Sequence, residues 1–246
     1  MTPVYAIGDI HGHLDQMEQA LDLIAQDGGL EAQTVFIGDY VDRGPDSKAV
    51  IAALILGLAN GRNWTCLKGN HDRMFEWFMA EPDSRHDPHL LVGYHWLHSA
   101  LGGEATAHSY GVDVPDRIRQ EDLAAELREA VPDAHKHFLK TLKIKHEVPG
   151  VFFAHAGVRP GVPLAQQVEN DLVWIRQAFL HDGTDHGALV VHGHTSVKGG
   201  PELHANRLAI DTGAGYGRPL RPVVIEDDGV FELTRKGRQR LQVIHS

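Results

Sequence analysis

The chain has 246 residues, of which 42% are hydrophobic and 23% are charged, as is typical of a folded α/β domain. Its net charge of −10 argues against binding to nucleic acid through the phosphate backbone, because such binding needs a basic surface. The longest apolar run, from Ala49 to Leu58, is too short to span a bilayer, and no signal-peptide core follows Met1. We therefore expect one domain over residues 1–246, cytoplasmic, with no membrane and no nucleic-acid partner.

The first third of the chain alternates short β-rich segments with helical patterns, which is typical of parallel strands joined by helices. The predicted strands are Val4–Ile7, Thr34–Ile37 and Trp64–Leu67. Apolar residues at three- and four-residue spacing predict helices over Leu14–Ala25 and Ser47–Leu58, and a third helix after His71.

The second part of the chain first becomes polar and then returns to strands. Residues 81–149 have a helical pattern that prolines interrupt, so we expect a helical insertion at one edge of the sheet. Later strands are predicted at Gly150–Ala154, Ala188–Val191, Leu208–Ile210 and Pro222–Glu226, followed by a hairpin strand from Val230.

Polar residues occur where five of these strands end, which is where open α/β sheets place ligands and catalytic groups. Asp9 and His11 are two residues apart in GDIHG, so their side chains project on one side. Asp39 follows the second strand in GDYVDRGPDS, with Asp42 and Arg43 one turn further on. The later strand ends carry Asn70, His71 and Asp72 in KGNHD, His155 in HAG, and His192 and His194 in HGHT.

These side chains offer a mixture of oxygen and nitrogen ligands, which suits Mn, Fe or Zn better than Ca. We expect two divalent metal ions, Mn²⁺ first and Fe or Zn as alternatives. A carboxylate such as Asp39 can bridge two ions about 3.5–4 Å apart, and a water between them then becomes a hydroxide near neutral pH. Arg43 and a second arginine would hold the phosphate oxygens of an ester under attack by this hydroxide.

The set of motifs resembles the calcineurin-like metallophosphoesterase superfamily, and within it the bacterial relatives of the serine/threonine phosphoprotein phosphatases. The resemblance extends from about Ala6 to Tyr216, and GDYVDRG is its most specific block. It implies an α/β fold, with a central β-sandwich of two mixed sheets flanked by helices and a helical insertion at 81–149.

The resemblance also implies a role for each matched residue. Ligands of one metal would be Asp9, His11 and Asp39, and ligands of the second would be Asp39, Asn70, His155 and His192. His71 resembles the general acid that protonates the leaving alkoxide, and Asp42 its orienting carboxylate. The phosphate would be held by Arg43 and Arg176, although Arg176 could instead pair with Asp171 or Asp182 at the surface.

Other polar residues in the same blocks receive no ligand role. His194 is expected to lie outside the set of metal ligands, and Tyr216 either faces the pocket or packs. The stretch from Trp96 to Gly111 resembles a segment of bacterial members and is expected to border the substrate cleft, with no ligand of its own.

The sequence leaves the substrate open. The VDRGPDS form favours phosphoserine or phosphothreonine, so the first expectation is a phosphorylated protein or a small phosphoester. Dinucleoside polyphosphates such as diadenosine tetraphosphate are the alternative, because their hydrolases share the scaffold. A nuclease is disfavoured by the acidic chain. A scaffold that binds phosphorylated partners without cleaving them is also disfavoured, since the ligands and the acid are all present.

Overall fold

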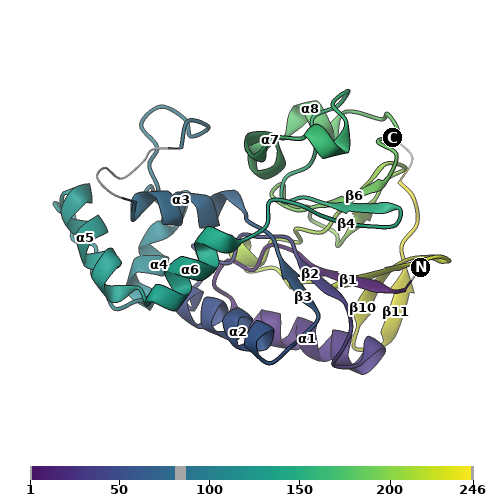
Figure 1. Ribbon diagram of the computed structural model, residues 1–246, viewed down its shortest axis with the longest axis horizontal. Helices are drawn as coiled ribbons and strands as arrows, with labels where there is room; N and C mark the ends of the chain where they lie inside the picture. The colour runs from purple at the N-terminus through teal and green to yellow at the C-terminus, as the bar shows by residue number, and fades with distance from the viewer. Residues whose placement is uncertain (1, 81–86, 245–246) are drawn as a thin grey trace.

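Two β-sheets pack face to face between layers of helices (Figure 1). This computed structural model describes residues 2–80 and 87–244. The first sheet has the strand order β11-β10-β9-β1-β2-β3, and the second has the order β4-β5-β6-β8-β7.

Both sheets combine parallel and antiparallel strands. In the first sheet β1, β2 and β3 run parallel and the C-terminal strands add in antiparallel orientation. Its strands are β1 (Val4–Ile7), β2 (Thr34–Phe36), β3 (Trp64–Cys66), β9 (Val223–Glu226), β10 (Gly229–Thr234) and β11 (Gly237–Arg240). In the second sheet β5, β6 and β8 are parallel, with β4 and β7 antiparallel outside them. Its strands are β4 (His146–Val148), β5 (Val151–Phe153), β6 (Leu189–His192), β7 (Glu202–Leu203) and β8 (Arg207–Ala209).

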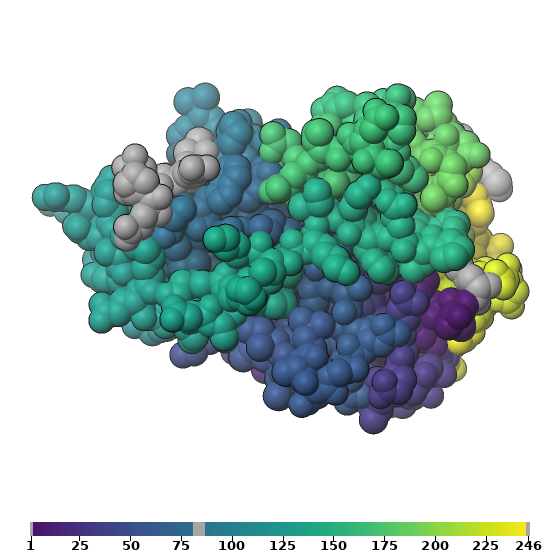
Figure 2. All heavy atoms as spheres, viewed as in Figure 1, coloured from purple at the N-terminus to yellow at the C-terminus, as the bar shows by residue number. Residues whose placement is uncertain are grey.

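Helices cover the two outer faces. The first sheet is covered by α1 (Leu14–Gly28) and α2 (Ser47–Ala59), and the second by α7 (Glu169–Trp174) and α8 (Gln177–Leu180) (Figure 1). Helix α3 (Asn70–Phe78) starts directly after β3 and leads into the insertion. The insertion contains α4 (Gly103–Ser109), α5 (Gln120–Ala130) and α6 (Asp133–Thr141), whose atoms form a lobe on one side of the molecule (Figure 2).

Alternation along the strands divides the core into layers, because successive side chains point to opposite faces. Ala6 and Val35 face the second sheet and pack with Phe153 and Val191. Their neighbours, such as Phe36, face α1 and α2 in a separate cluster. Burial of each large aliphatic side chain stabilises the fold by about 1.5–3 kcal/mol. The sandwich therefore holds its strand ends rigidly.

The structure confirms the expected fold of two mixed sheets flanked by helices. Strands β4, β7 and β11 were not predicted, and β4 occupies residues 146–148 at the end of the expected insertion. Such short strands have at most one fully buried face, so the apolar alternation that marks a strand is weak. Residues 81–86, at the start of the insertion, lie outside the described residues. No helix within residues 2–80 and 87–244 is long and apolar enough to cross a membrane.

Candidate active site

The ends of the central strands bring most of the candidate residues together. Asp9 and His11 follow β1, Asp39 follows β2, Asn70 follows β3 and His155 follows β5. All five side chains are buried. Because the carboxyl ends of parallel strands meet at one edge of each sheet, residues distant in sequence converge there.

Asp39 lies between two groups of possible ligands. Its Oδ2 is 3.5 Å from Nε2 of His11, and its Oδ1 is 3.5 Å from Nε2 of His155. Within the described residues, one group of converging ligand atoms contains His11, Asp39 and His71, and the other contains Asp39, His155 and His194. A carboxylate that offers one oxygen to each group has the arrangement of a bridging ligand.

The second group has the donor pattern of a cation site. Nδ1 of His155 lies 3.0 Å from the carbonyl oxygen of Ile37, and a carbonyl can only accept a hydrogen bond. The ring therefore carries its proton on Nδ1, and the lone pair of Nε2 points at Oδ1 of Asn70, 3.0 Å away. Oδ1 of Asn70 is also 2.7 Å from Nδ1 of His194. The converging lone pairs of His155 Nε2 and Asn70 Oδ1 fit a metal ion. In this structure Nδ1 of His194 carries the ring proton, because its Nε2 accepts from Nε of Arg176, so His194 would bind an ion through Nδ1 in its other tautomer.

In the group of His11, Asp39 and His71, a backbone carbonyl also orients a histidine ring. Nδ1 of His11 lies 2.8 Å from the carbonyl oxygen of Val41, which leaves Nε2 as the lone-pair atom facing the site. In this structure that Nε2 accepts a hydrogen bond from Nη1 of Arg43 at 2.6 Å. Nη2 of the same guanidinium lies 3.1 Å from Nε2 of His71.

Burial sets the protonation of these groups. Burial lowers the pKa of His11, His155 and His194, and therefore keeps the imidazoles in the neutral form that binds metals. Burial also raises the pKa of Asp9, and the nearby carboxylates of Asp211 and Asp39 add to the rise. A buried cation would lower the pKa of Asp9 again, because it stabilises the charged forms of the neighbouring carboxylates.

Backbone strain is concentrated in the same place. The non-glycine residues with positive φ among those described are His11, Asp39, Asp42, Arg43 and His194, and all five belong to these blocks. Each such conformation costs on the order of 1–3 kcal/mol and persists only where the surroundings impose it. Two glycines are required by contact with the carboxylates. A Cβ would lie 2.0 Å from Oδ1 of Asp39 if added to Gly69, and 2.1 Å from Oδ1 of Asp9 if added to Gly193.

Residues 2–214 match the family described as calcineurin-like phosphoesterase, which covers most of the chain. The chain belongs to this family. The phosphoesterase is 26% identical to serine/threonine-protein phosphatase 1 of Salmonella typhimurium, over 88% of this chain and 89% of the relative. It is 26% identical to the symmetrical bis(5'-nucleosyl)-tetraphosphatase of Legionella pneumophila, over 98% of this chain and all of the relative.

Other matches of the phosphoesterase are partial or concern the fold alone. Identity to the serine/threonine-protein phosphatase 4 catalytic subunit of Candida glabrata is 40%, but the match covers 29% of this chain and only 23% of that protein. A crystal structure of a cold-active protein tyrosine phosphatase has a TM-score of 0.65 at 17% identity, with 99% of this chain and 79% of that chain covered. This likeness supports the sandwich fold.

Of the two histidines in the HGHT block of the phosphoesterase, the structure brings His194 to a group of possible ligands, and not His192, which was the expected ligand. His192 is the last residue of β6, and its ring packs on Phe179 under the outer helices, on the same face as Val190. It takes part in neither ligand group, whereas His194 does. In a continuous strand His192 and His194 would point to the same side. They do not, because the backbone leaves the strand at Gly193 and His194 has a φ of 63°. The side chain of His194 is thereby turned toward Asn70.

Asp42 and His71 form a buried pair, as expected from their blocks. Nδ1 of His71 lies 2.7 Å from Oδ2 of Asp42. Burial raises the pKa of Asp42 to about 7, and burial lowers the pKa of His71 to about 3. Both shifts favour the uncharged forms, so a proton added to the pair belongs to both residues.

The two arginines expected to hold the phosphate both reach the site. Arg43 touches His11 and His71, and its guanidinium lies 4.7 Å from the ring centre of Tyr216. Nε of Arg176 donates to Nε2 of His194 at 2.8 Å. The alternative surface pairing of Arg176 with Asp171 is not observed, because Asp171 pairs with Arg159.

Sequence reasoning gave no role to several buried residues of the site. The carboxylate of Asp72 accepts hydrogen bonds from the backbone N–H groups of Asp39, Tyr40 and Gly69, so it fixes the turn that carries Asp39. Asp211 lies buried just after β8, and a search of every strand end would have found it. The stretch from Trp96 to Gly111 was expected only to border the cleft, and nothing in its local sequence indicates that Trp96 and Thr106 bind Asp42.

Proposed function

We propose that this phosphoesterase hydrolyses phosphate monoesters with two divalent metal ions, Mn²⁺ in the first instance, and acts as a serine/threonine phosphatase-like enzyme. The observation that supports this best is the position of Asp39, with one carboxylate oxygen near His11 and the other near His155. Such a shared carboxylate is the feature that a two-metal site needs.

The residues present fit this pair of ions. One ion would be held by His11 and Asp39, together with Asp9, which is buried near Asp39 although it is in neither group of converging ligand atoms. The other would be held by Asp39, Asn70, His155 and His194, with His194 in place of His192. When bound, the ions supply a hydroxide near neutral pH and neutralise negative charge on the phosphoryl group. The ring tautomers of His11 and His155 are already set for this role by the carbonyl oxygens of Val41 and Ile37.

The side chains of the enzyme would do the remaining work. Arg43 and Arg176 would donate to the phosphoryl oxygens, because their guanidinium groups already lie at this edge and their present partners are neutral imidazoles. His71 would give a proton from Nε2 to the leaving alkoxide. Asp42 would hold the ring through Nδ1, and its carboxylate would offset the positive charge of the protonated imidazole.

Hydrolysis of dinucleoside polyphosphates is the second candidate. It is favoured by the match along the whole length of a symmetrical bis(5'-nucleosyl)-tetraphosphatase. The phosphatase of Salmonella typhimurium matches nearly as much of the chain at the same identity, so the choice depends on the site. The intact Asp42 and His71 pair beside Arg43 favours the monoesterase, since an alkoxide leaving group needs a general acid.

A substrate panel tests the proposal. Protein stripped of metal is reconstituted with Mn, Fe or Zn and assayed on a phosphoserine peptide, p-nitrophenyl phosphate, diadenosine tetraphosphate and single-stranded DNA. We expect both monoesters to be the preferred substrates and activity to require the metal. Preference for diadenosine tetraphosphate would establish the second candidate, and preference for DNA would establish a nuclease. A phosphopeptide that binds tightly but stays intact would indicate a non-catalytic module.

A further inference from the structure

The carboxylate of Asp42 is surrounded by the helical insertion. Oδ1 accepts hydrogen bonds from the hydroxyl of Thr106 at 2.8 Å and from Nε1 of Trp96 at 3.0 Å. Oδ2 accepts from the same Trp96 nitrogen at 3.0 Å and lies 2.7 Å from His71. Both oxygens are fully occupied, and Asp42 is completely buried.

The backbone of the same turn is held by the same segment. The N–H of Asp42 donates to Oγ1 of Thr106 at 2.7 Å, and the N–H of Arg43 donates to the carbonyl oxygen of Gly102 at 3.1 Å. Asp42 and Arg43 have φ values of 73° and 71°, so the turn is strained. These contacts from the insertion oppose its relaxation.

From this geometry we infer that Trp96 and Thr106 are positioning residues for the Asp42 and His71 pair. The insertion then forms part of the reaction machinery instead of only bordering the substrate. The inference rests on the proposed phosphatase function, since it concerns the residue that would protonate the leaving group. It requires no change in the metal ligands, because neither residue contacts one.

The chemistry of the two donors explains why they suit this role. The hydroxyl of Thr106 donates to the carboxylate of Asp42, and it accepts from the N–H of Asp42 and from the hydroxyl of Ser47. All of its hydrogen-bonding positions are therefore occupied. Trp96 is fixed by ring contacts with Phe75 and Phe78, at centroid distances of 5.1 and 4.7 Å. Their hydrogen bonds to Asp42 oppose the effect of burial on its pKa, and so favour the carboxylate that orients an imidazole.

A purely structural role makes a different prediction. If Trp96 and Thr106 only satisfied a buried polar group, their loss would lower the free energy of unfolding and slow all substrates alike. If they position the general acid, the loss must depend on the leaving group, because an activated ester needs no proton.

The variant Thr106→Val removes one donor with little change in volume, and Trp96→Phe removes the indole N–H while it keeps an aromatic ring. With metal content verified, we expect turnover of phenyl phosphate to fall about 10–100-fold, and that of 2,4-dinitrophenyl phosphate to fall less than about threefold. His71→Asn, which removes the proposed general acid itself, shows how much each of the two esters slows when the acid is lost. Thr106→Ser keeps the hydroxyl and should restore the wild-type ratio of the two esters. Equal slowing of both esters in Trp96→Phe and Thr106→Val would overturn the inference.

Tyr110→Phe is the matched control. It removes a buried hydrogen bond from the same insertion, the 2.9 Å contact of the Tyr110 hydroxyl with Nδ1 of His135, but leaves Asp42 untouched. We expect no change in the ratio of the two esters. A ratio in Tyr110→Phe like that of Trp96→Phe would mean that any loosening of the insertion suffices, and would also overturn the inference.

A second measurement does not depend on turnover. In proton NMR of the protein loaded with diamagnetic Zn²⁺, the Nδ1–H of His71 is identified by its loss in His71→Asn. It should shift or broaden in Trp96→Phe and in Thr106→Val, and remain in Tyr110→Phe. An unchanged resonance in both donor variants would contradict the inference even if the enzyme is an active phosphatase. If the wild type cleaves no monoester, the proposed function fails while this resonance still decides the inference.

Discussion

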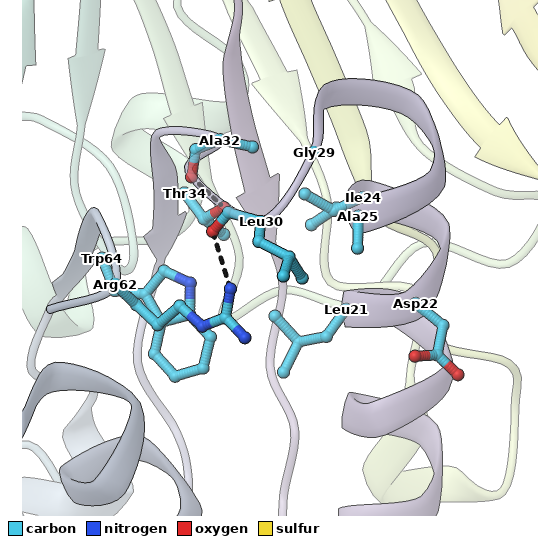
Figure 3. Close-up of a pocket in the computed structure, with 10 residues that line it drawn as sticks. All are labelled: Leu21, Asp22, Ile24, Ala25, Gly29, Leu30, Ala32, Thr34, Arg62 and Trp64. Atoms are coloured by element: carbon cyan, nitrogen blue, oxygen red, sulfur yellow. Dashed lines mark hydrogen bonds between the residues drawn. The ribbon is translucent and has the colours of Figure 1, made fainter. Parts of the chain in front are cut away.

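The two ends of the first sheet differ in how they treat polar groups. At the carboxyl ends of β1, β2 and β3, buried carboxylates and imidazoles face one another on a strained backbone. At the opposite end, before β2 and β3, a shallow groove is lined by apolar side chains such as Leu21, Leu30 and Trp64 (Figure 3). There Arg62 donates to the carbonyl oxygen of Leu30 at 2.9 Å.

A functional edge of a sheet can be recognised by its backbone strain and its buried polar groups. Around the groove the positive φ angles belong to glycines, Gly29 and Gly61, and the polar groups find ordinary partners such as the carbonyl oxygen that Thr34 binds. At the other edge, positive φ at non-glycine residues and burial of charged groups both lower the stability of the fold. Such costs persist where function requires the arrangement.

The largest expected effect is at the shared carboxylate. We expect Asp39→Asn to lose metal and to lower kcat/KM by on the order of a thousandfold or more, because both ligand groups lose an anionic oxygen. The measurements are metal content by mass spectrometry and turnover of p-nitrophenyl phosphate. Arg62→Ala, at the opposite end of the sheet, is the control and should retain both metal and activity. A metal-loaded Asp39→Asn with near-normal turnover would remove the contrast between the ends.

A second comparison separates the two histidines of HGHT. His194→Ala should weaken metal binding by at least about 10–100-fold, since it removes a group that converges on Asn70 and His155. His192→Ala should keep metal affinity and instead reduce stability, because its ring packs on Phe179. Calorimetric titration with Mn²⁺ and thermal unfolding of each variant distinguish the two. Loss of metal in His192→Ala alone would restore the assignment made from sequence.

The variant Arg176→Ala tests whether this arginine, at the outer rim of the site, binds the phosphate. Its side chain is exposed but directed at His194, so Arg176→Ala should lower kcat/KM by about 10–100-fold, the value of a charge-assisted hydrogen bond or two. Inorganic phosphate should inhibit this variant more weakly, while metal content should not change. Unaltered inhibition by phosphate would show that Arg176 does not hold the substrate.

The smallest effect concerns a carboxylate far from the site. Arg238 hydrogen-bonds to Asp27 and holds the pKa of that carboxyl below its usual value, in contrast with the raised pKa of Asp9. A depressed pKa contributes stability above the unfolded value near 4, and the contribution disappears as pH falls through the folded value. Asp27→Asn should therefore be less stable than the wild type at pH 7, and the difference in urea unfolding should shrink toward pH 3. A difference in the free energy of unfolding that stays constant from pH 7 to pH 3 would contradict a contribution from the lowered pKa of Asp27.

The strongly apolar or amphipathic elements and the ligands directly after strands could be predicted from the amino-acid sequence alone. Helix α1 has apolar residues at the spacing of one buried face, whereas β1 and α2 are almost continuous apolar segments of strand and helix length. Asp9, Asp39 and Asn70 follow strands whose ends must meet, so their proximity follows from parallel topology alone.

Which histidine of HGHT faces the site, and which side chains surround Asp42, depends on contacts between segments that are distant in the sequence. The turn at Gly193 breaks the strand alternation, and its conformation depends on the contact of the His194 N–H with Asp9, 185 residues away in sequence. Trp96 and Thr106 reach Asp42 across 54 and 64 residues. Local periodicity encodes which face a side chain lies on, whereas contacts between distant turns are set by how the layers pack.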